Sequence, residues 1–298
     1  MHELRAQNLV PNPSFEDHDS CPQYNGNFFC TPWFSPTRNT PDYFNQCWNG
    51  WWFDSMDVPS NRFGSQNART GVAYAGFAGL YASQNGREYI SIKLSDTLLA
   101  GIIYNVEYYV SLADSSWGGI NKLGAHFSNT PDTMYAGMYT YNLPFQPQLE
   151  FDTVIIDTTN WVRLSGNYIA FGGECYLTIG VFKTDSLLTY DTIQGDGSSR
   201  GAYYYIDDVS VVKYQPTVYP AITLFPNPSN GEFTITGNFP EHTQLFVYDM
   251  LGQKVMESPY LPVGNNSAAV HLQLAQGVYY YELRSTEILA TGKLYIVK

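Results

Sequence analysis

Basic side chains are scarce in this sequence. Its 298 residues include 15 Lys and Arg but 27 Asp and Glu, so the formal net charge is −12 at pH 7. Nucleic acids and anionic membrane surfaces favour partners that carry basic patches, and we therefore expect no nucleic acid and no anionic membrane surface as a partner. The acidic balance fits an extracellular protein or a calcium binder.

Long apolar runs are also missing. No stretch of apolar residues is long enough to cross a bilayer as a helix, which predicts a chain without a membrane span. The first seven residues, MHELRAQ, are too short and too polar for a signal peptide. We interpret residues 1–7 as the remnant of a signal peptide that ends at an Ala-x-type cleavage site, or of an added leader.

The familiar catalytic motifs are absent. The five His are scattered and do not form an HExxH pattern, and no GxSxG elbow occurs. The Gly-rich segment GDGSSRG at 195–201 leads into a strand pattern and not into a helix, so it does not predict a phosphate site. We predict no catalytic residues, although a carboxylate pair for glycoside hydrolysis would not be visible in a sequence.

Cysteines are few, and none lies in the last quarter of the chain. The four are Cys21, Cys30, Cys47 and Cys175. An even number in an exported protein indicates disulfides, and three connectivities are open. We favour Cys21–Cys30, which closes a short loop and leaves Cys47–Cys175. A metal–thiolate site is disfavoured because no CxxC pair is present.

Short alternating apolar runs dominate what is present. After Ala68 they are separated by turn residues, with almost no helical periodicity between them, which predicts a β-sandwich or jelly roll. We assign residues 8–214 to this domain, with an extra strand at Phe151–Ile156, and residues 215–221 to a linker. Residues 222–298 repeat the pattern on a smaller scale and predict a small, Ig-like antiparallel sandwich.

The last 75 residues also resemble a known family. The matching motifs are PNPSNG at 226–231, YD at 248–249, LG at 251–252, GVY at 277–279 and GK at 292–293, before a terminal Lys298. In this order they are similar to the C-terminal sorting domain of proteins exported by the type IX (Por) secretion system. The resemblance implies export through the periplasm to the outer cell surface or the extracellular space, with the secretion machinery as a partner.

A second resemblance concerns the larger domain. NLVPN at 8–12 with FE at 15–16, ARTGVAYAGF at 68–77 and YIDDVSV at 205–211 resemble the frame of jelly rolls of the carbohydrate-binding-module type. In that fold a structural calcium ion often lies where the first and last strands meet. Glu16 and Asp207 match the two carboxylate positions, and Asp207 shares strand parity with Val209 and Val211. Carbonyl groups near residues 69–71 would complete the oxygen shell. The alternative is that the two carboxylates belong to an ordinary polar cluster or form hydrogen bonds to this loop.

Residues 20–68 form a long segment without a strand or helix pattern but rich in aromatic rings. Rings of Trp and Tyr have apolar faces and polar edges, which suit sugar stacking, although they also suit a local core. Our candidate ligand-binding residues are Trp33, Tyr43, Trp48, Trp51, Trp52 and, on the later DSSWGG turn, Trp117.

These observations predict a secreted or cell-surface, non-catalytic protein that binds a glycan or another cell-surface polymer. One alternative is a structural subunit of a surface assembly or filament, in which the aromatic segment mediates self-assembly. The other is a polysaccharide-active enzyme built on a jelly roll.

Overall fold

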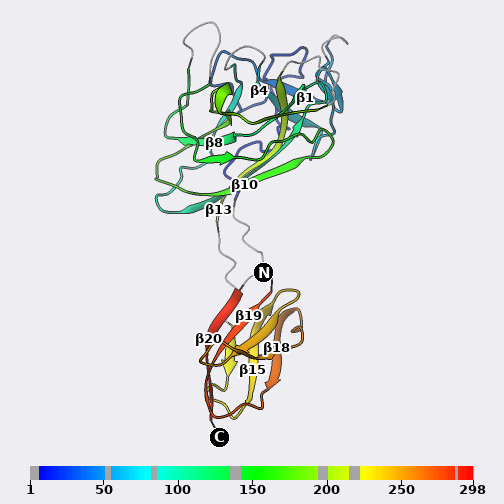
Figure 1. Cartoon of the computed structure of the whole chain (residues 1–298). Coiled ribbons are helices and arrows are strands. Elements are labelled where there is room, and N and C mark those ends of the chain that lie inside the picture. The colour runs from blue at the N-terminus through cyan, green and yellow to red at the C-terminus, as the bar shows by residue number, and fades with distance from the viewer. Residues whose placement is uncertain are drawn as a thin grey trace. The chain divides into compact units, whose positions relative to one another are not determined.

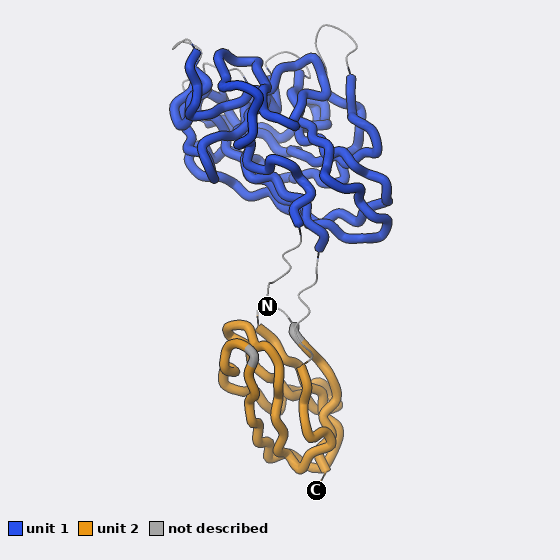
Figure 2. Tube along the Cα trace, turned by 180° about the vertical axis from the view of Figure 1, so that it is seen from behind, with its two compact units in different colours: residues 1–214 blue, residues 215–298 orange. Residues whose placement is uncertain are grey.

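A computed structural model of the chain divides into two units, residues 1–214 and residues 215–298 (Figure 2). The structure describes residues 7–50, 55–81, 86–134, 142–193, 201–214, 222–285 and 288–297. Each unit is described by itself. The linker assigned to residues 215–221 and nearly all of the segment assigned to residues 1–7 lie outside the described residues.

The larger unit contains a five-stranded antiparallel sheet in the order β1-β4-β13-β6-β10 (Figure 1). Its strands are β1 (Asp42–Asn45), β4 (Ala73–Leu80), β13 (Ala202–Lys213), β6 (Ile103–Leu112) and β10 (Val162–Ile169). β13 pairs with both β4 and β6, so the last strand of the unit lies in the middle of this sheet.

A four-stranded sheet, in the order β5-β11-β8-β9, forms the other layer. Its strands are β5 (Tyr89–Lys93), β11 (Tyr176–Val181), β8 (Leu123–Ser128) and β9 (Leu149–Phe151). Two short pairs complete the unit, namely β2 (Ser60–Asn61) with β3 (Gly64–Ser65), and β7 (Gly118–Ile120) with β12 (Tyr190–Thr192). A single 3-10 turn, η2 (Asp185–Leu187), is the only helical element among the described residues.

The core lies between these two sheets. On β6 the buried residues Tyr104, Val106, Tyr108 and Val110 alternate with half-buried ones, as period-two side-chain direction requires. β13 contributes Tyr204 and Ile206 but then Val209 and Val211, so the inward parity changes along this strand. A β-bulge causes the change: the register with β6 shifts between Asp207 and Ser210, and Asp208 has a φ of +49°.

A second cluster covers the opposite face of the five-stranded sheet. Phe44, Met56, Tyr74, Tyr203 and Tyr205 are buried there, and Trp48, Phe63 and Trp161 pack against them. Much of the irregular segment that follows β1 is therefore ordered by rings laid on the sheet. This outcome agrees with the local-core alternative for the aromatic segment.

The smaller unit is a sandwich of a three-stranded sheet, β14-β15-β18, and a four-stranded sheet, β17-β16-β19-β20 (Figure 1). Its strands are β14 (Thr223–Phe225), β15 (Glu232–Phe239), β16 (Gln244–Tyr248), β17 (Lys254–Glu257), β18 (Gly264–His271), β19 (Gly277–Arg284) and β20 (Ile288–Ile296). Phe233, Ile235, Leu245, Val247 and Leu294 form part of its core.

The predicted all-β fold class is confirmed, with corrections in detail. The strand predicted at Phe151–Ile156 is wrong, because β9 ends at Phe151. The segment predicted to lack strands contains β1, which pairs with β4 along its whole length. No helix in the described part of the chain is long and apolar enough to span a membrane.

The predicted disulfide pairing is also wrong. Cys21 pairs with Cys47, with Cα atoms 5.6 Å apart, while Cys30 and Cys175 are free. Cys30 is turned into the protein, where its Sγ contacts the carbonyl oxygen atoms of Phe15 and Asp17. β1 brings Cys47 beside the N-terminal segment, a long-range contact that spacing along the sequence does not reveal.

Truncation of a core side chain tests which positions stabilise the larger unit. Ile206 on β13 is fully buried, whereas Ile169 on β10 is 62% exposed. Replacing Ile206 by Ala leaves a cavity, and we expect the free energy of unfolding to fall by about 2–5 kcal/mol. The same change at Ile169 should alter it by less than about 0.5 kcal/mol. Denaturant unfolding followed by fluorescence measures both, and equal effects would contradict the assigned core.

Candidate functional site

A pocket of about 220 Å³ opens at the end of the five-stranded sheet where β4 ends and β13 begins. Its walls come from separate elements: Asp42 of β1, Ala78 and Leu80 of β4, and Tyr203 of β13. The turn between β2 and β3 adds further lining residues. Sheet pairing thus brings together residues that lie more than a hundred positions apart in the sequence.

Two buried carboxylates line this pocket, and both are held by tyrosine hydroxyls. Tyr203 Oη donates to Asp42 Oδ2 at 2.6 Å, and Tyr81 Oη donates to Glu88 Oε1 at 2.6 Å. The backbone N–H of Ala78 donates to Glu88 Oε2 at 2.7 Å. Burial, and then the nearby charge of Asp42, raise the pKa of Glu88 to about 8, so this pair resists carrying two negative charges.

Two aromatic residues, Phe63 and Tyr203, are among the lining residues of the pocket. The ring of Phe63 stacks on that of Tyr203, with centroids 4.0 Å apart and planes 7° from parallel. Exposed Arg62 precedes Phe63 on the β2–β3 turn, and the ring of Tyr81 is partly exposed on the opposite strand end. Apolar faces next to charged and amide groups are the usual composition of a site for a small polar ligand.

An exposed tryptophan lies on a turn whose backbone is hydrogen-bonded to residues that line the pocket. Trp117 is 53% exposed, and its backbone N–H donates to the carbonyl of Gly201, which lines the pocket. The preceding residues of the same turn are also tied to the lining: Ser115 donates its N–H to the carbonyl of Phe63, and Ser116 Oγ accepts the N–H of Tyr203. The turn that carries Trp117 is therefore fixed to three lining residues.

The other predicted ring residues have different positions. Trp33 and Tyr43 are buried, so the expectation that they present a free face to a ligand is corrected. Trp33 Nε1 donates to the carbonyl of Asn12, and Tyr43 Oη donates to the carbonyl of Phe15, which makes both parts of the core. Trp48 is half-buried against the outer aromatic cluster. Trp51 and Trp52 lie outside the described residues.

The predicted metal-binding carboxylates hold one loop from two sides. Glu16 Oε1 accepts the N–H groups of Val72 and Ala73 at 2.9 and 3.1 Å. Asp207 Oδ2 accepts the N–H groups of Arg69 and Thr70 at 2.8 and 3.3 Å. We call this arrangement the carboxylate clamp. Burial and the adjacent Asp208 raise the pKa of Asp207 to about 8.

The bulge corrects the expected direction of Asp207. Asp207 pairs in register with Tyr109, and its side chain lies on the outer face of the five-stranded sheet, opposite to Val209 and Val211. Arg69 forms its ion pair with Asp208 and not with Asp207. In the described part of the chain no side-chain cation lies within ion-pair distance of Asp207, although this carboxyl group is fully buried.

Sequence reasoning missed the pocket itself. Asp42 lies in a segment predicted to be irregular, and Glu88 and Tyr81 were given no role. One signal was visible: Arg87 and Glu88 place two charges at the start of an otherwise apolar strand pattern. Both are buried, and Arg87 pairs with Asp185 at 2.6 Å. Charged side chains in a buried strand need oppositely charged or hydrogen-bonding partners. Two such residues in a row therefore indicate a buried polar network or a functional site nearby.

The raised pKa of Glu88 gives a defined pH dependence. Because the folded-state pKa lies above the unfolded value of about 4.3, stability is fully present below that value and is lost as pH rises towards 8. Glu88→Gln mimics the protonated acid, so we expect its melting temperature to fall less than the wild type's between pH 5 and 8. The exposed control Glu241→Gln should follow the wild type. Parallel curves for the wild type and Glu88→Gln would contradict this account.

Comparisons with solved structures give matches of low identity. An arabinose-bound α-L-arabinofuranosidase is 12% identical, with a TM-score of 0.36, and the match covers 69% of this chain and 26% of that chain. A protein from Bacteroides thetaiotaomicron described as sugar-binding is 12% identical (TM-score 0.37; 70% and 100% covered). The K2 cleaved adhesin domain of Lys-gingipain is 12% identical (TM-score 0.35; 67% and 96% covered). This chain thus spans about a quarter of the length of the arabinofuranosidase.

A comparison with curated proteins gives no match. Among family models, the secretion system C-terminal sorting domain matches residues 223–298, which is nearly all of the smaller unit. The motifs that pointed to the same family lie on both turns and strands of that unit: PNPSNG connects β14 to β15, LG lies between β16 and β17, and GVY and GK lie on β19 and β20. Residues 223–298 are a type IX C-terminal sorting domain, which directs the protein to the cell surface or the extracellular space.

Proposed function

We propose that this exported protein binds glycans without cleaving them, and that the pocket between β4, β13 and the β2–β3 turn is its sugar site. The observation that supports this most directly is the stacked pair Phe63–Tyr203 beside the carboxylates of Asp42 and Glu88. Sugar rings present C–H faces to aromatic rings and hydroxyl groups to acceptors, and the pocket offers both kinds of surface.

The size and position of the pocket favour recognition of one sugar unit in a longer chain. A volume of about 220 Å³ has room for about one ring. Trp117, on the turn tied to Gly201, would give a neighbouring unit a second stacking surface. Tyr81 and Arg62, both exposed, also line the pocket.

The bonding of the carboxylates supports binding over hydrolysis. Asp42 accepts hydrogen bonds from Tyr203 Oη and from the N–H of Gly26, and Glu88 accepts from Tyr81 Oη and from the N–H of Ala78. All four carboxylate oxygen atoms are therefore engaged by the protein. A general acid has to reach the glycosidic oxygen within hydrogen-bond distance, whereas these oxygen atoms are held by protein donors and keep only a second lone pair for a sugar hydroxyl.

Removal of the rim tryptophan tests the proposal. We expect Trp117→Ala to weaken binding to a glycan identified on an array by about tenfold or more, the loss of one well-placed aromatic contact. Isothermal titration with that glycan measures the change. Phe171→Ala is the matched control, because Phe171 is an exposed ring, 83% accessible, on the loop between β10 and β11.

Other outcomes would overturn the proposal. Equal losses in Trp117→Ala and Phe171→Ala would contradict a site at this rim. No glycan binding together with concentration-dependent assembly in ultracentrifugation would support the surface-subunit alternative. Release of reducing ends from any polysaccharide, abolished in Glu88→Gln, would support an enzyme.

We also propose calcium as a structural ion at the carboxylate clamp. Gly71 has a φ of +65°, and a Cβ there would lie 2.1 Å from Glu16 Oε1, so the loop is shaped to admit this carboxylate. Asp207 is buried with no side-chain cation beside it among the described residues. Glu16, Asp207 and carbonyl groups of residues 69–71 would hold the ion, which supplies positive charge between the two carboxylates.

A chelator tests the calcium proposal. With weak extracellular sites at about 10⁻⁴–10⁻³ M, 10 mM calcium should raise the free energy of unfolding by about 1.4–2.7 kcal/mol. Differential scanning calorimetry with 10 mM calcium or with excess chelator measures the shift in melting temperature. We expect the shift to vanish in Glu16→Gln and to persist in the exposed control Glu241→Gln. A wild-type protein that melts identically in both buffers contains no such site.

A further inference from the structure

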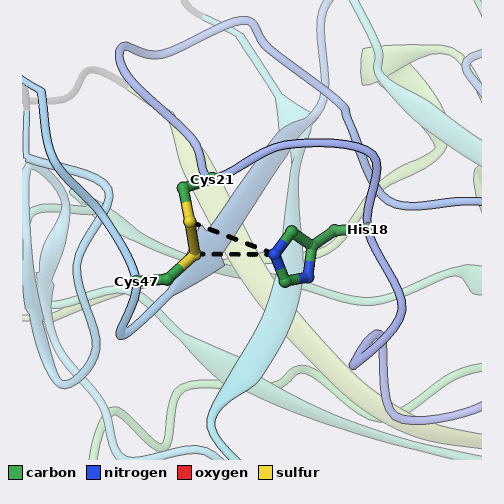
Figure 3. A group of neighbouring side chains, drawn as sticks. All are labelled: His18, Cys21 and Cys47. Atoms are coloured by element: carbon green, nitrogen blue, oxygen red, sulfur yellow. Dashed lines mark hydrogen bonds between the residues drawn. A yellow bond between two sulfur atoms is a disulfide. The ribbon is translucent and has the colours of Figure 1, made fainter.

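A histidine faces the disulfide of the larger unit. Figure 3 shows the ring of His18 with one nitrogen directed at the two sulfur atoms. His18 Nε2 lies 3.7 Å from Cys47 Sγ and 4.0 Å from Cys21 Sγ. His18 and Cys21 belong to the N-terminal segment, whereas Cys47 follows β1. In the described part of the chain this is the one group of three or more His, Cys, Asp or Glu ligand atoms that lie within 4.8 Å of one another.

The other ring nitrogen determines which tautomer faces the sulfur atoms. His18 Nδ1 lies 3.1 Å from the carbonyl oxygen of Glu16. A carbonyl only accepts, so the proton of the neutral ring is on Nδ1, and the lone pair of Nε2 is directed at the sulfur atoms. A backbone carbonyl that fixes the ring in this way is the usual outer partner of a metal-binding histidine.

We propose that reduction of Cys21–Cys47 converts this group into a zinc site with His18, Cys21 and Cys47 as ligands. A dithiol reductant supplies two electrons and two protons, is itself oxidised to a disulfide, and leaves two cysteine thiols. A zinc ion then displaces the two thiol protons and binds both thiolates and His18 Nε2. Two thiolates and one imidazole leave one position of a tetrahedral ion for water.

The distances fit this ion closely. Zn–S bonds of about 2.3 Å and Zn–N bonds of about 2.0–2.1 Å at tetrahedral angles place a ligating nitrogen about 3.6 Å from each sulfur atom. The observed separations of 3.7 and 4.0 Å are already near this value. The Cα atoms of the two cysteines are 5.6 Å apart, so rotation of the side chains is enough to separate the sulfur atoms to the roughly 3.8 Å that a shared zinc ion requires.

The ligands are positioned by contacts that do not involve the sulfur atoms. The N–H of Cys47 donates to Asn45 Oδ1 at 2.8 Å, and Asn45 Nδ2 donates to Tyr43 Oη at 2.7 Å. The ring of His18 packs against Tyr43, with centroids 5.8 Å apart. These contacts remain after reduction, so the site is largely organised before a metal ion arrives. His18 is exposed, which gives the ion access from solvent.

The two free cysteines provide matched controls. Cys30 is buried, and burial raises the pKa of its thiol, which disfavours the thiolate that zinc requires. Cys175 is half-buried and directly precedes β11, and its Sγ donates to the carbonyl of Asn129. No histidine shares a metal-binding group with either of them among the described residues.

Zinc titration of the full chain tests the proposal. We would reduce the protein with a phosphine, which does not compete for zinc as a thiol does, and titrate zinc against a chromophoric chelator. We expect one zinc ion per reduced chain and none per oxidised chain. His18→Ala and Cys47→Ser should weaken binding by about 100-fold or more, whereas Cys175→Ser should bind as the wild type does. Cobalt in place of zinc should give a thiolate charge-transfer band and the visible spectrum of a tetrahedral ion.

The oxidised wild-type protein keeps the result interpretable where a variant folds poorly, because it has the same sequence without free thiolates at the site. Equal zinc binding by the oxidised and reduced forms would overturn the proposal. So would unchanged affinity in His18→Ala, or loss of the bound ion in Cys175→Ser alone, which would place the metal elsewhere.

Discussion

The carboxylate clamp on the loop that precedes β4 is the constraint on which the larger unit depends. Glu16 and Asp207 bind consecutive backbone N–H groups of this loop and join the N-terminal segment to the last strand of the unit. From the clamp, β4 and β13 run side by side to the pocket, with Ile206 opposite Ala75 and Tyr203 opposite Ala78. The register that the clamp fixes at one end therefore determines which side chains of β4 and β13 meet as far as Tyr203, where the register shifts between Ala202 and Tyr203.

Hydrogen bonds from tyrosine hydroxyl groups hold a long irregular segment on the sheet. Tyr203 donates to Asp42, Tyr205 to Asn61 Oδ1 at 2.8 Å, and Tyr74 to the carbonyl of Gln66 at 3.1 Å. Each ring buries apolar area against the sheet, while its hydroxyl group satisfies a polar group of the segment above it. A phenylalanine at these positions would remove one hydrogen bond from the carboxylate, amide or carbonyl of the segment. The buried acids of the pocket are tolerated for the same reason.

Local signals in the sequence were enough for the long core strands and for the sorting domain. Alternation identified β6 and β10, because each has one face on the core, and separated motifs identified residues 223–298. Long-range contacts decided the rest. The direction of Asp207 depends on a bulge, which adds one residue without changing the residue pattern. The disulfide and the pocket depend on β1, whose pairing with β4 places Cys47 beside Cys21 and Asp42 beside Tyr203, and no spacing along the chain encodes that pairing.

β1 also links the pocket to the group formed by His18, Cys21 and Cys47. Its side chains alternate: Tyr43 points into the core and bonds to the carbonyl of Phe15, whereas Asp42 and Phe44 point to the outer face. Asp42 is opposite Gly76 in the register, and a Cβ at Gly76 would lie 2.5 Å from Tyr203 Oη, so the absence of a side chain at Gly76 leaves room for the Tyr203 hydroxyl that bonds to Asp42. Cys47 lies two residues after Asn45, the last residue of β1. Whatever joins Cys47 to the N-terminal segment, a disulfide or a shared metal ion, therefore acts on the strand that places Asp42 in the pocket.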